Sequence, residues 1–491
     1  MSRTLRKSAC FLGGVLAANI AWADAIYHPP GSNLTFGDVT HGLRVQSASS
    51  NPAAGAADLA RGENRGSRGA VVSASAGLEY GNVENLFEWY DKITGAYKPS
   101  DPDSGGGGPG QDPGDKPDDG IDLGDIWDNL DPDVQAALEA VAREVAVQGA
   151  LLSVVRNEGY GRAWLAGDVP FQMGSELFGG AMTFGFGWSG NAKAFGLTEE
   201  IDYDPDAARQ ALEDWLAELP FQRPELFPIS DDVMLHVSPD SSRLGLVLTN
   251  DSSIVSKSSQ LFEFEFGYSG LAYSNDHGSL FLGAEAHLYY MRLSRLSVRF
   301  GDITHSEELF DAIRDAEFEQ DTRVGLDVGA LWVADNYQIG AQITNVNAPK
   351  FQFPDINLDP YSSEQIIGFL QQDKTYEMDQ QLKLEASIFT DNRRWSAHIG
   401  VDADPAVDPL GDKYQWLTLS AGYVNETWWA PSIRFGLREN LEGTRRRYAS
   451  LGATLFNVVN LDIASAFDVV EIDGQDLPQG LMISLGFQIV W

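Results

Sequence analysis

The sequence has a single cysteine in 491 residues, and that residue, Cys10, lies in an N-terminal stretch with the features of a signal peptide. A basic start is followed by an apolar core of about a dozen residues and then by Ala21-Trp22-Ala23, an A-x-A cleavage site. We therefore expect residues 1–23 to be removed and the mature chain to begin at Asp24. A mature chain without cysteine excludes disulfides, thiolate metal sites and cysteine catalysis, and it suits an oxidising compartment of the bacterial envelope.

Basic side chains are scarce. The whole chain has 34 lysines and arginines against 71 acidic residues, and the expected signal peptide contains three of the basic residues and none of the acidic ones. The mature chain then has 31 basic against 71 acidic side chains, a formal charge of −40. Because such a surface repels phosphate backbones, we expect no direct binding of nucleic acid.

Long apolar runs are also missing. After the signal peptide no run approaches the roughly 18 residues that indicate a membrane-spanning helix, and a retained N-terminal anchor would need about 20. The chain shows alternation instead. In LFEFEFGY, Phe262, Phe264 and Phe266 alternate with Glu263 and Glu265, and a strand places these two sets on opposite faces.

The same period of two recurs in segments of about 8 to 12 residues that are separated by turns rich in Asn, Asp and Gly, as in a membrane-spanning barrel. The segments are LFLGAEAHLYY, RVGLDVGALW, YQIGAQIT, QLKLEASIF, WLTLSAGY and the last twelve residues. A soluble β-sandwich also alternates, but here the polar face is persistently small or charged, as a wet lumen requires, and aromatic residues gather at segment ends. We therefore predict an all-β fold, an antiparallel outer-membrane β-barrel of about 12 to 16 strands over residues 69–491.

The final strand carries Leu485, Phe487, Ile489 and Trp491 on one face. A secreted chain that ends on an alternating strand with a terminal aromatic is typical of the signal that the barrel-assembly machinery of the Gram-negative outer membrane recognises. These four residues are the predicted assembly signal. The alternative is that Trp491 merely ends a buried strand.

Other segments are not strands. Helical spacing predicts helical insertions near 82–93, 132–157, 204–219 and 306–319. Residues 98–125 form an acidic stretch rich in Gly and Pro, predicted to be a disordered loop. A calcium loop is the weaker interpretation of that stretch, because Gly105 stands where a ligand is needed. Residues 24–68 form an N-terminal segment that could plug the barrel.

Catalytic and metal-binding motifs are not found. The seven histidines are scattered, without a pair at helical spacing for zinc, and we predict no cofactor and no metal site. Glu285 and His287 share a face of one predicted strand, so they are the pair that an envelope hydrolase would use. A solvated pair in the lumen is the favoured interpretation. Arg445, Arg446 and Arg447 would bind lipopolysaccharide phosphates or lie at the wet end of a strand.

Two resemblances follow from these residues. Asn51-Pro52-Ala53 near the N-terminus of a barrel of this length is similar to the FadL-like superfamily of long-chain fatty-acid transporters. Residues from about Asp321 to Trp491 resemble the outer-membrane family catalogued as conjugal transfer protein TraF, through the order and spacing of DTRVGLDVGALWVADNYQIGAQITNVNAPKF, YEMDQQLKLEASIF, WSAHIGVDAD and YQWLTLSAGYVNE. The stretch 98–125 departs from both.

The TraF resemblance implies a non-catalytic structural or assembly role in the outer membrane, with lipid, lipopolysaccharide and other conjugation or envelope proteins as partners. The FadL-like resemblance implies an alternative, the passive transport of hydrophobic small molecules. In that case the segment around Asn51 blocks the lumen, and an apolar pocket is expected inside the barrel.

Overall fold

A computed structural model describes most of the predicted barrel and part of the N-terminal segment. The described residues are 30–41, 50–61, 68–81, 159–174, 180–199, 226–228, 232–237, 244–302, 311–372, 374–425, 427–472 and 475–490. The expected signal peptide, the helices expected at 82–93, 132–157 and 204–219, the stretch 98–125 and Trp491 lie outside them. Of the helix expected at 306–319, residues 311–314 are helical and Glu319 already begins a strand.

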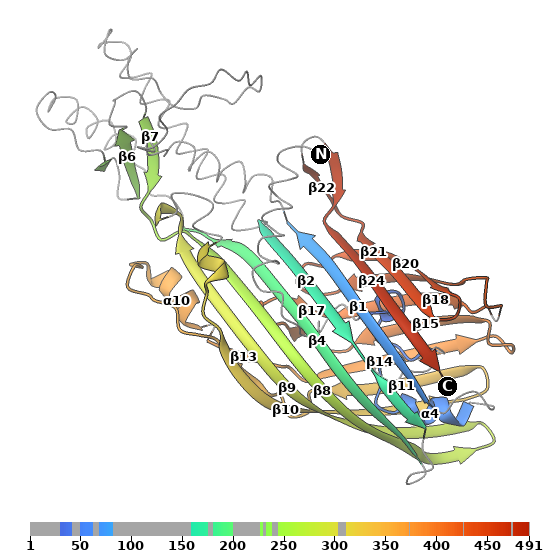
Figure 1. The fold of residues 1–491 in the computed structure, drawn as a ribbon. Coiled ribbons are helices and arrows are strands. Elements are labelled where there is room, and N and C mark those ends of the chain that lie inside the picture. Colours follow the sequence, from blue (N-terminus) through green and yellow to red (C-terminus); the bar gives the residue numbers. More distant parts are fainter. Residues whose placement is uncertain are drawn as a thin grey trace, which may run out of the picture.

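Fourteen antiparallel strands form a closed barrel, which confirms the predicted fold class (Figure 1). Each strand pairs with its neighbours in chain order, and the last pairs with the first. The strands are β1 (Arg68–Tyr80), β2 (Tyr160–Asp168), β4 (Gly180–Leu197), β8 (Ser253–Asn275), β9 (Gly278–Arg299), β10 (Glu319–Val333), β11 (Tyr337–Thr344), β14 (Gln381–Phe389), β15 (Trp395–Asp402), β18 (Trp416–Tyr423), β19 (Ser432–Asn440), β20 (Arg447–Leu455), β21 (Val459–Ala466) and β24 (Gly480–Val490). The short β3 (Phe171–Gly174) follows β2 and pairs with the first residues of β1.

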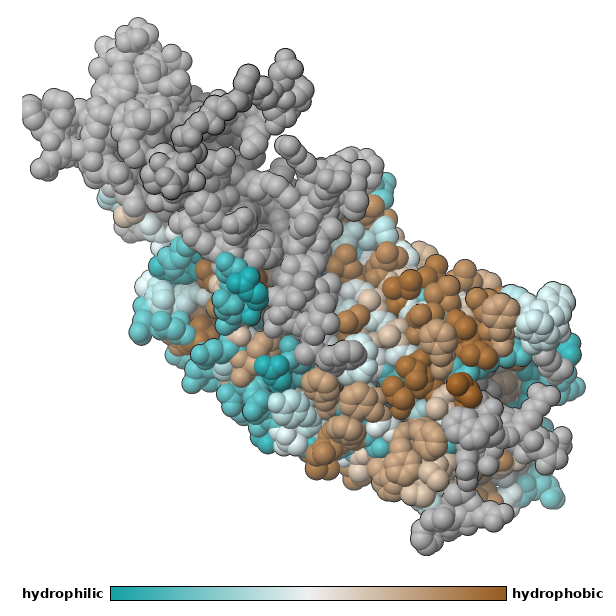
Figure 2. Space-filling view, viewed as in Figure 1, coloured by the Kyte–Doolittle hydropathy of each residue, from teal (hydrophilic) through white to brown (hydrophobic). Residues whose placement is uncertain are grey.

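The alternation read from the sequence separates the two faces of the wall. On β24, Leu485 and Ile489 are 44% and 61% exposed, whereas Met482 and Ser484 between the apolar residues are buried. Figure 2 shows hydrophobic residues gathered over the flank made by β1, β24 and their neighbours. An apolar outer band around a polar interior is the arrangement of an outer-membrane barrel.

The two ends of the barrel differ. Short turns join β8 to β9 and β10 to β11 at the end where β1 begins, whereas long loops, including 345–380 and 403–415, lie at the other end. In outer-membrane barrels the short turns face the periplasm and the long loops face outward. We call these the turn end and the loop end.

Three strands are much longer than a membrane requires. β4, β8 and β9 have 18, 23 and 22 residues, while about 9 to 11 tilted residues span a bilayer. The surplus lies at the loop end, where loop 345–380 covers it. That loop carries β12 (Lys350–Gln352), α10 (Glu364–Gln372) and β13 (Thr375–Glu377). Its apolar side chains pack on inward residues of β8 and β9, including Phe351 against Tyr289 and Ile366 against Val255.

Smaller elements complete the described fold. The remaining sheets are β5 (Leu226–Pro228) with β6 (Val233–Val237) and β7 (Leu244–Leu248), β16 (Ala406–Val407) with β17 (Lys413–Tyr414), and β22 (Val469–Ile472) with β23 (Gln475–Pro478). A 3-10 turn, η2 (Phe300–Asp302), follows β9. None of the helices in the described part of the chain is long and apolar enough to cross a membrane.

The described N-terminal residues lie inside the barrel. They form α2 (Asn33–Phe36) and α4 (Ala54–Arg61), and α4 lies near the turn end, beside the end of β24 in Figure 1. Leu34 and Ala53 are 1% and 0% exposed. Residues 30–41 and 50–61 are called the inner segment below.

Candidate functional site: the barrel interior

The inner segment reaches the wall at a pair of glycines. Gly283 of β9 and Gly329 of β10 are cross-strand partners. A Cβ atom on Gly283 would lie 2.1 Å from the carbonyl oxygen of Pro52, and one on Gly329 would lie 2.2 Å from Oδ1 of Asn51. Only glycine lets the wall approach Asn51-Pro52 this closely.

Asn51 also shapes the turn that leads into α4. Its Oδ1 accepts a hydrogen bond from the backbone N–H of Ala53 at 3.0 Å, and its carbonyl accepts one from Ala54 at 2.8 Å. This Asx-type turn is what an Asn-Pro pair before a short helix favours. The predicted motif Asn51, Pro52 and Ala53 is therefore buried against the wall as a local turn, and its role in function is not tested by this geometry.

Glu385 of β14 holds two parts of the inner segment together. Its Oε1 accepts hydrogen bonds from the Thr40 hydroxyl at 2.7 Å and from Nδ2 of Asn51 at 3.0 Å. Two strand positions away, Lys383 forms an ion pair of 2.5 Å with Asp38. These side chains are buried or partly buried, so each contact forms in a medium of low polarity where charge-assisted hydrogen bonds are strong.

A second anchor holds α2. Thr35 donates to Oδ1 of Asp462 at 2.5 Å, and Arg434 donates to the same carboxylate through Nε at 2.7 Å and Nη2 at 2.5 Å. The ring of His41 stacks on Phe36 at 4.5 Å. Burial lowers the pKa of His41 well below its usual range, and the nearby His398 and Arg434 lower it further. The docked imidazole is therefore neutral.

A cavity of ≈160 Å³ lies between the inner segment, the wall and the loops 345–380 and 403–415. Six carboxylates line it, against the basic side chain of Lys383 and the imidazole of His287. The carboxylates belong to Asp38, Asp168, Glu263, Glu265, Asp327 and Asp379. The cavity is thus polar and acidic, unlike the apolar pocket that hydrophobic transport predicts.

Glu285 and His287 both face this interior and are buried, as their shared strand face predicts. The short contact of His287, however, is to the next strand, where Oε1 of Glu263 lies 2.6 Å from Nδ1. Oδ2 of Asp327 lies 3.5 Å from Nε2. Glu285 instead accepts a hydrogen bond from Thr183 at 3.4 Å. The sequence pattern on β9 alone could not identify the partner, because it lies across the sheet.

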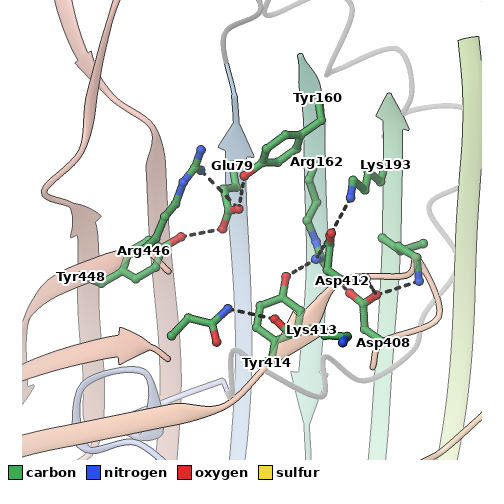
Figure 3. Close-up of polar contacts among 12 residues, drawn as sticks. Glu79, Tyr160, Arg162, Lys193, Asp408, Asp412, Lys413, Tyr414, Arg446 and Tyr448 are labelled. Carbon is green, nitrogen blue, oxygen red and sulfur yellow. Dashed lines mark hydrogen bonds and ion pairs between the residues drawn. The ribbon is translucent and has the colours of Figure 1, made fainter. Parts of the chain in front are cut away.

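At the loop end, loop 403–415 is fixed to the wall by buried charges (Figure 3). Arg162 of β2 pairs with Asp408 at 2.6 Å and with Asp412 at 2.8 Å. Lys193 of β4 also contacts Asp412, and Arg162 donates to the hydroxyl of Tyr414. Burial by itself raises the pKa of Asp412, but Lys193 and Arg162 outweigh it and hold that pKa below its usual value.

A neighbouring cluster in Figure 3 centres on Glu79 of β1. Its carboxylate accepts hydrogen bonds from Tyr160 at 2.6 Å and Tyr448 at 2.5 Å, and it lies 3.2 Å from Nη1 of Arg446. Arg446 also donates to the carbonyl of Tyr80 at 2.8 Å. Arg446 is 5% exposed and engaged by the wall, so of the two interpretations of the arginine run, the lipopolysaccharide site does not apply to this residue.

A match to a protein-family model shows the family to which the chain belongs. Residues 48–404, most of the chain, match the family model described as F plasmid transfer operon, TraF, protein. The chain belongs to this TraF family. The match includes the inner segment from Asn51 onward and the strands from β1 to β15, so it extends well before the region from Asp321 in which the sequence resembles the family.

Among solved structures, this TraF-family chain is similar in fold to outer-membrane barrels. One is a TodX deltaS2S3 mutant, a monoaromatic hydrocarbon channel, at 10% identity and TM-score 0.41, covering 94% of this chain and 98% of that one. The toluene transporter TodX of Pseudomonas putida matches at 9% identity and TM-score 0.37, covering 95% and 98%. A FadL homologue of Pseudomonas aeruginosa matches at 10% identity and TM-score 0.28, covering 96% and 99%. No curated protein sequence matches the chain.

Proposed function

We propose that this TraF-family barrel is a non-catalytic structural component of the outer membrane whose interior is filled by its own inner segment. The observation that carries the proposal is the pair of anchors at Glu385 and Asp462, which fix Thr35, Thr40 and Asn51 inside the wall. The inner segment then acts as a plug. Loops 345–380 and 403–415 close the opposite end by apolar packing and buried ion pairs.

The chemistry of the buried histidines agrees with this role. His398 contacts the hydroxyl of Ser387 at 2.8 Å through Nδ1 and that of Ser396 at 2.9 Å through Nε2. A general base that activates a serine needs its second nitrogen oriented by a further group, usually a carboxylate. Here both nitrogens are used by hydroxyls, so we interpret the Ser–His contact as packing of the interior.

Conductance in planar bilayers tests the plug. The mature chain is expected to give small or no steady conductance, and a variant lacking residues 24–67 is expected to give stable open channels. Each protein must first show a folded gel band that shifts on boiling. Steady channels from the intact chain would contradict a filled interior.

A place in conjugation is suggested by the family description, which names a plasmid transfer operon. We propose that the barrel supports a transfer or envelope assembly, with other envelope proteins as partners and no direct contact with DNA. Donor cells lacking the gene should transfer plasmids less often, and the cloned gene should restore transfer. Unchanged transfer in the deletion strain would remove this part of the proposal.

The alternative is passive transport. A barrel of fourteen strands is wide enough to hold a small ligand once its interior is vacated, and the described part of the inner segment is held by non-covalent contacts alone, namely hydrogen bonds, the ion pair at Asp38 and apolar packing around Leu34 and Ala53. Proteoliposomes separate the two functions. Uptake of a hydrophobic solute by the intact chain, lost on replacing residues that line its path, would favour transport over a structural role.

Export and assembly complete the proposal. We infer that residues 1–23 direct export and that Leu485, Phe487, Ile489 and Trp491 form the signal for the assembly machinery; the first three of these project outward on β24. Deleting Trp491 is expected to reduce recovery of the folded chain in the outer membrane. Equal recovery of the shortened chain would show that the signal lies elsewhere.

A further inference from the structure

The cavity wall formed by β2, β4, β8 and β9 holds acidic side chains around one imidazole. We propose that Glu263, Glu265 and His287, with Asp168 beside them, bind a divalent metal ion of the Zn²⁺ class inside the barrel. The proposal rests on the barrel geometry alone. It stands whether or not the barrel serves in plasmid transfer.

The first argument is the position of the ligand atoms. One atom each from Glu263, Glu265 and His287 lies within 4.8 Å of the others. A zinc ion takes histidine nitrogen and carboxylate oxygen at about 2.0 to 2.2 Å, so the three atoms need only small side-chain rotations to share one ion. One imidazole with several carboxylates is a donor set that suits Zn²⁺.

A buried carboxylate oxygen that is aimed into the cavity makes no hydrogen bond. Asp168 is 8% exposed, and its Oδ1 makes no hydrogen bond. His287 is 7% exposed, and its ring lies between two carboxylates, with Glu263 2.6 Å from Nδ1 and Asp327 3.5 Å from Nε2. A buried polar atom without a partner costs roughly 1–3 kcal/mol. A shared cation would satisfy these atoms together.

Glycines in the wall leave room beside these carboxylates, and the cavity has few positive charges. In the sheet, Gly187 lies between Asp168 and Glu263, and Gly185 lies beside Glu265. A Cβ atom on Gly185 would lie 2.2 Å from Oε2 of Glu265, so the carboxylates turn toward one another over residues without side chains. Among the described residues that line the cavity, Lys383 is the basic side chain, and it is already paired with Asp38. His287 contacts Glu263 and Asp327, so the six carboxylates of the described lining outnumber its two basic groups.

Metal titration of the detergent-solubilised mature chain, first stripped with EDTA, tests the site. Co²⁺ serves as a spectroscopic probe, because its visible absorption reports nitrogen ligation, and Zn²⁺ is then added as a competitor. One equivalent of Co²⁺ is expected to bind and to be displaced by Zn²⁺. His287→Gln and Glu265→Gln are each expected to weaken binding by about tenfold or more, as loss of one ligand predicts.

Two control variants test whether the metal ion is bound by the cavity residues and not elsewhere. His277→Gln changes an exposed histidine at the turn end and should bind as the unaltered chain does. A variant lacking residues 98–125 removes an acidic stretch that could bind cations weakly, and its high-affinity equivalent should remain. Folding of every variant is checked by the gel band that shifts on boiling, and Glu265→Gln, which preserves side-chain shape, serves if His287→Gln does not fold.

Three outcomes would overturn the proposal. They are the absence of Co²⁺ binding at millimolar concentration, binding by a folded Glu265→Gln or His287→Gln variant that equals the unaltered chain, and loss of all binding on deletion of residues 98–125.

Discussion

Glycines that face a barrel lumen can leave space for water or for another stretch of backbone. The sequence analysis interprets the small inward residues as the lining of a wet lumen. The structure shows a different use at Gly283 and Gly329, which receive the backbone and side chain of Asn51-Pro52. Composition could not distinguish these cases, because both require an inward residue without a side chain.

Replacing Gly283 tests this close approach. Gly283→Leu places atoms where the Pro52 carbonyl lies, so the inner segment should be displaced while the outer wall remains paired. We expect an increase in channel conductance and faster protease cleavage within residues 24–67. The matched control is Gly368→Leu, since a Cβ atom on Gly368 has nothing within 4 Å. Equal cleavage of the two variants would contradict the role of the glycine.

His41 makes docking of the inner segment sensitive to pH. Its pKa is lowered when docked, so the undocked segment binds more protons as the pH falls below about 6.5, the ordinary histidine value. The contribution of His41 to the stability of the docked segment is thus fully present above that pH and is lost as the pH falls below it. Protease cleavage of the segment should be faster at pH 5 than at pH 7.5.

The control for this effect is a histidine outside the interior. His41→Phe keeps an aromatic ring against Phe36 and removes the proton site, so it should reduce the pH dependence, whereas His277→Gln should leave it unchanged. A pH dependence that is the same in His41→Phe would assign it to the interior carboxylates instead.

At the scale of elements, side-chain contacts fix the loops at the loop end to the barrel wall. Loop 403–415 depends on Arg162, which is buried together with Asp408 and also pairs with the partly buried Asp412. Removing one side of a buried ion pair costs about 3–5 kcal/mol, because the opposite charge stays buried. Arg162→Met should therefore lower the temperature at which the folded gel band is lost.

The comparison for Arg162→Met is an arginine whose ion pairs are exposed. Arg314 pairs with Asp311 and Asp315 at the surface, so Arg314→Met should change that temperature little. Replacing Asp408 by asparagine in the Arg162→Met background removes the buried charge that has lost its partner, so it should restore part of the loss. No difference between the two single variants would mean that the loop is held mainly by its apolar contacts.

The helix α10 is not among the predicted helices, although its sequence carries a helix pattern. Ser363 precedes it, and Ile366 and Leu370 are four residues apart and buried, which is the pattern of a capped helix. The contact that fixes it could not be predicted at all, since Asp251, over a hundred residues earlier, accepts hydrogen bonds from the N–H groups of Ser362 and Ser363 at 2.5 and 2.6 Å.

At the scale of the whole molecule, the alternation was sufficient to predict a closed barrel but not its strand number. Phe264 and Phe266 on β8 gave a clear apolar face, and they are 56% and 46% exposed. β1 reads RGAVVSASAGLEY, in which small residues occupy both faces, so its register depends on its neighbours. The acidic cavity was also beyond sequence reasoning, because Asp168, Glu263 and Asp327 come from three strands far apart in the chain.

The ladder between β1 and β24 constrains the order in which the chain can fold. Gly69 pairs with Val490 and Glu79 with Gly480, so the seam joins residues separated by nearly the full length of the polypeptide. Contacts of such sequence separation form late, because a very long loop must first close. The inner segment precedes β1 and ends up enclosed, so it must enter while the seam is still open. Zipping of the seam is therefore the step that completes the wall around the inner segment.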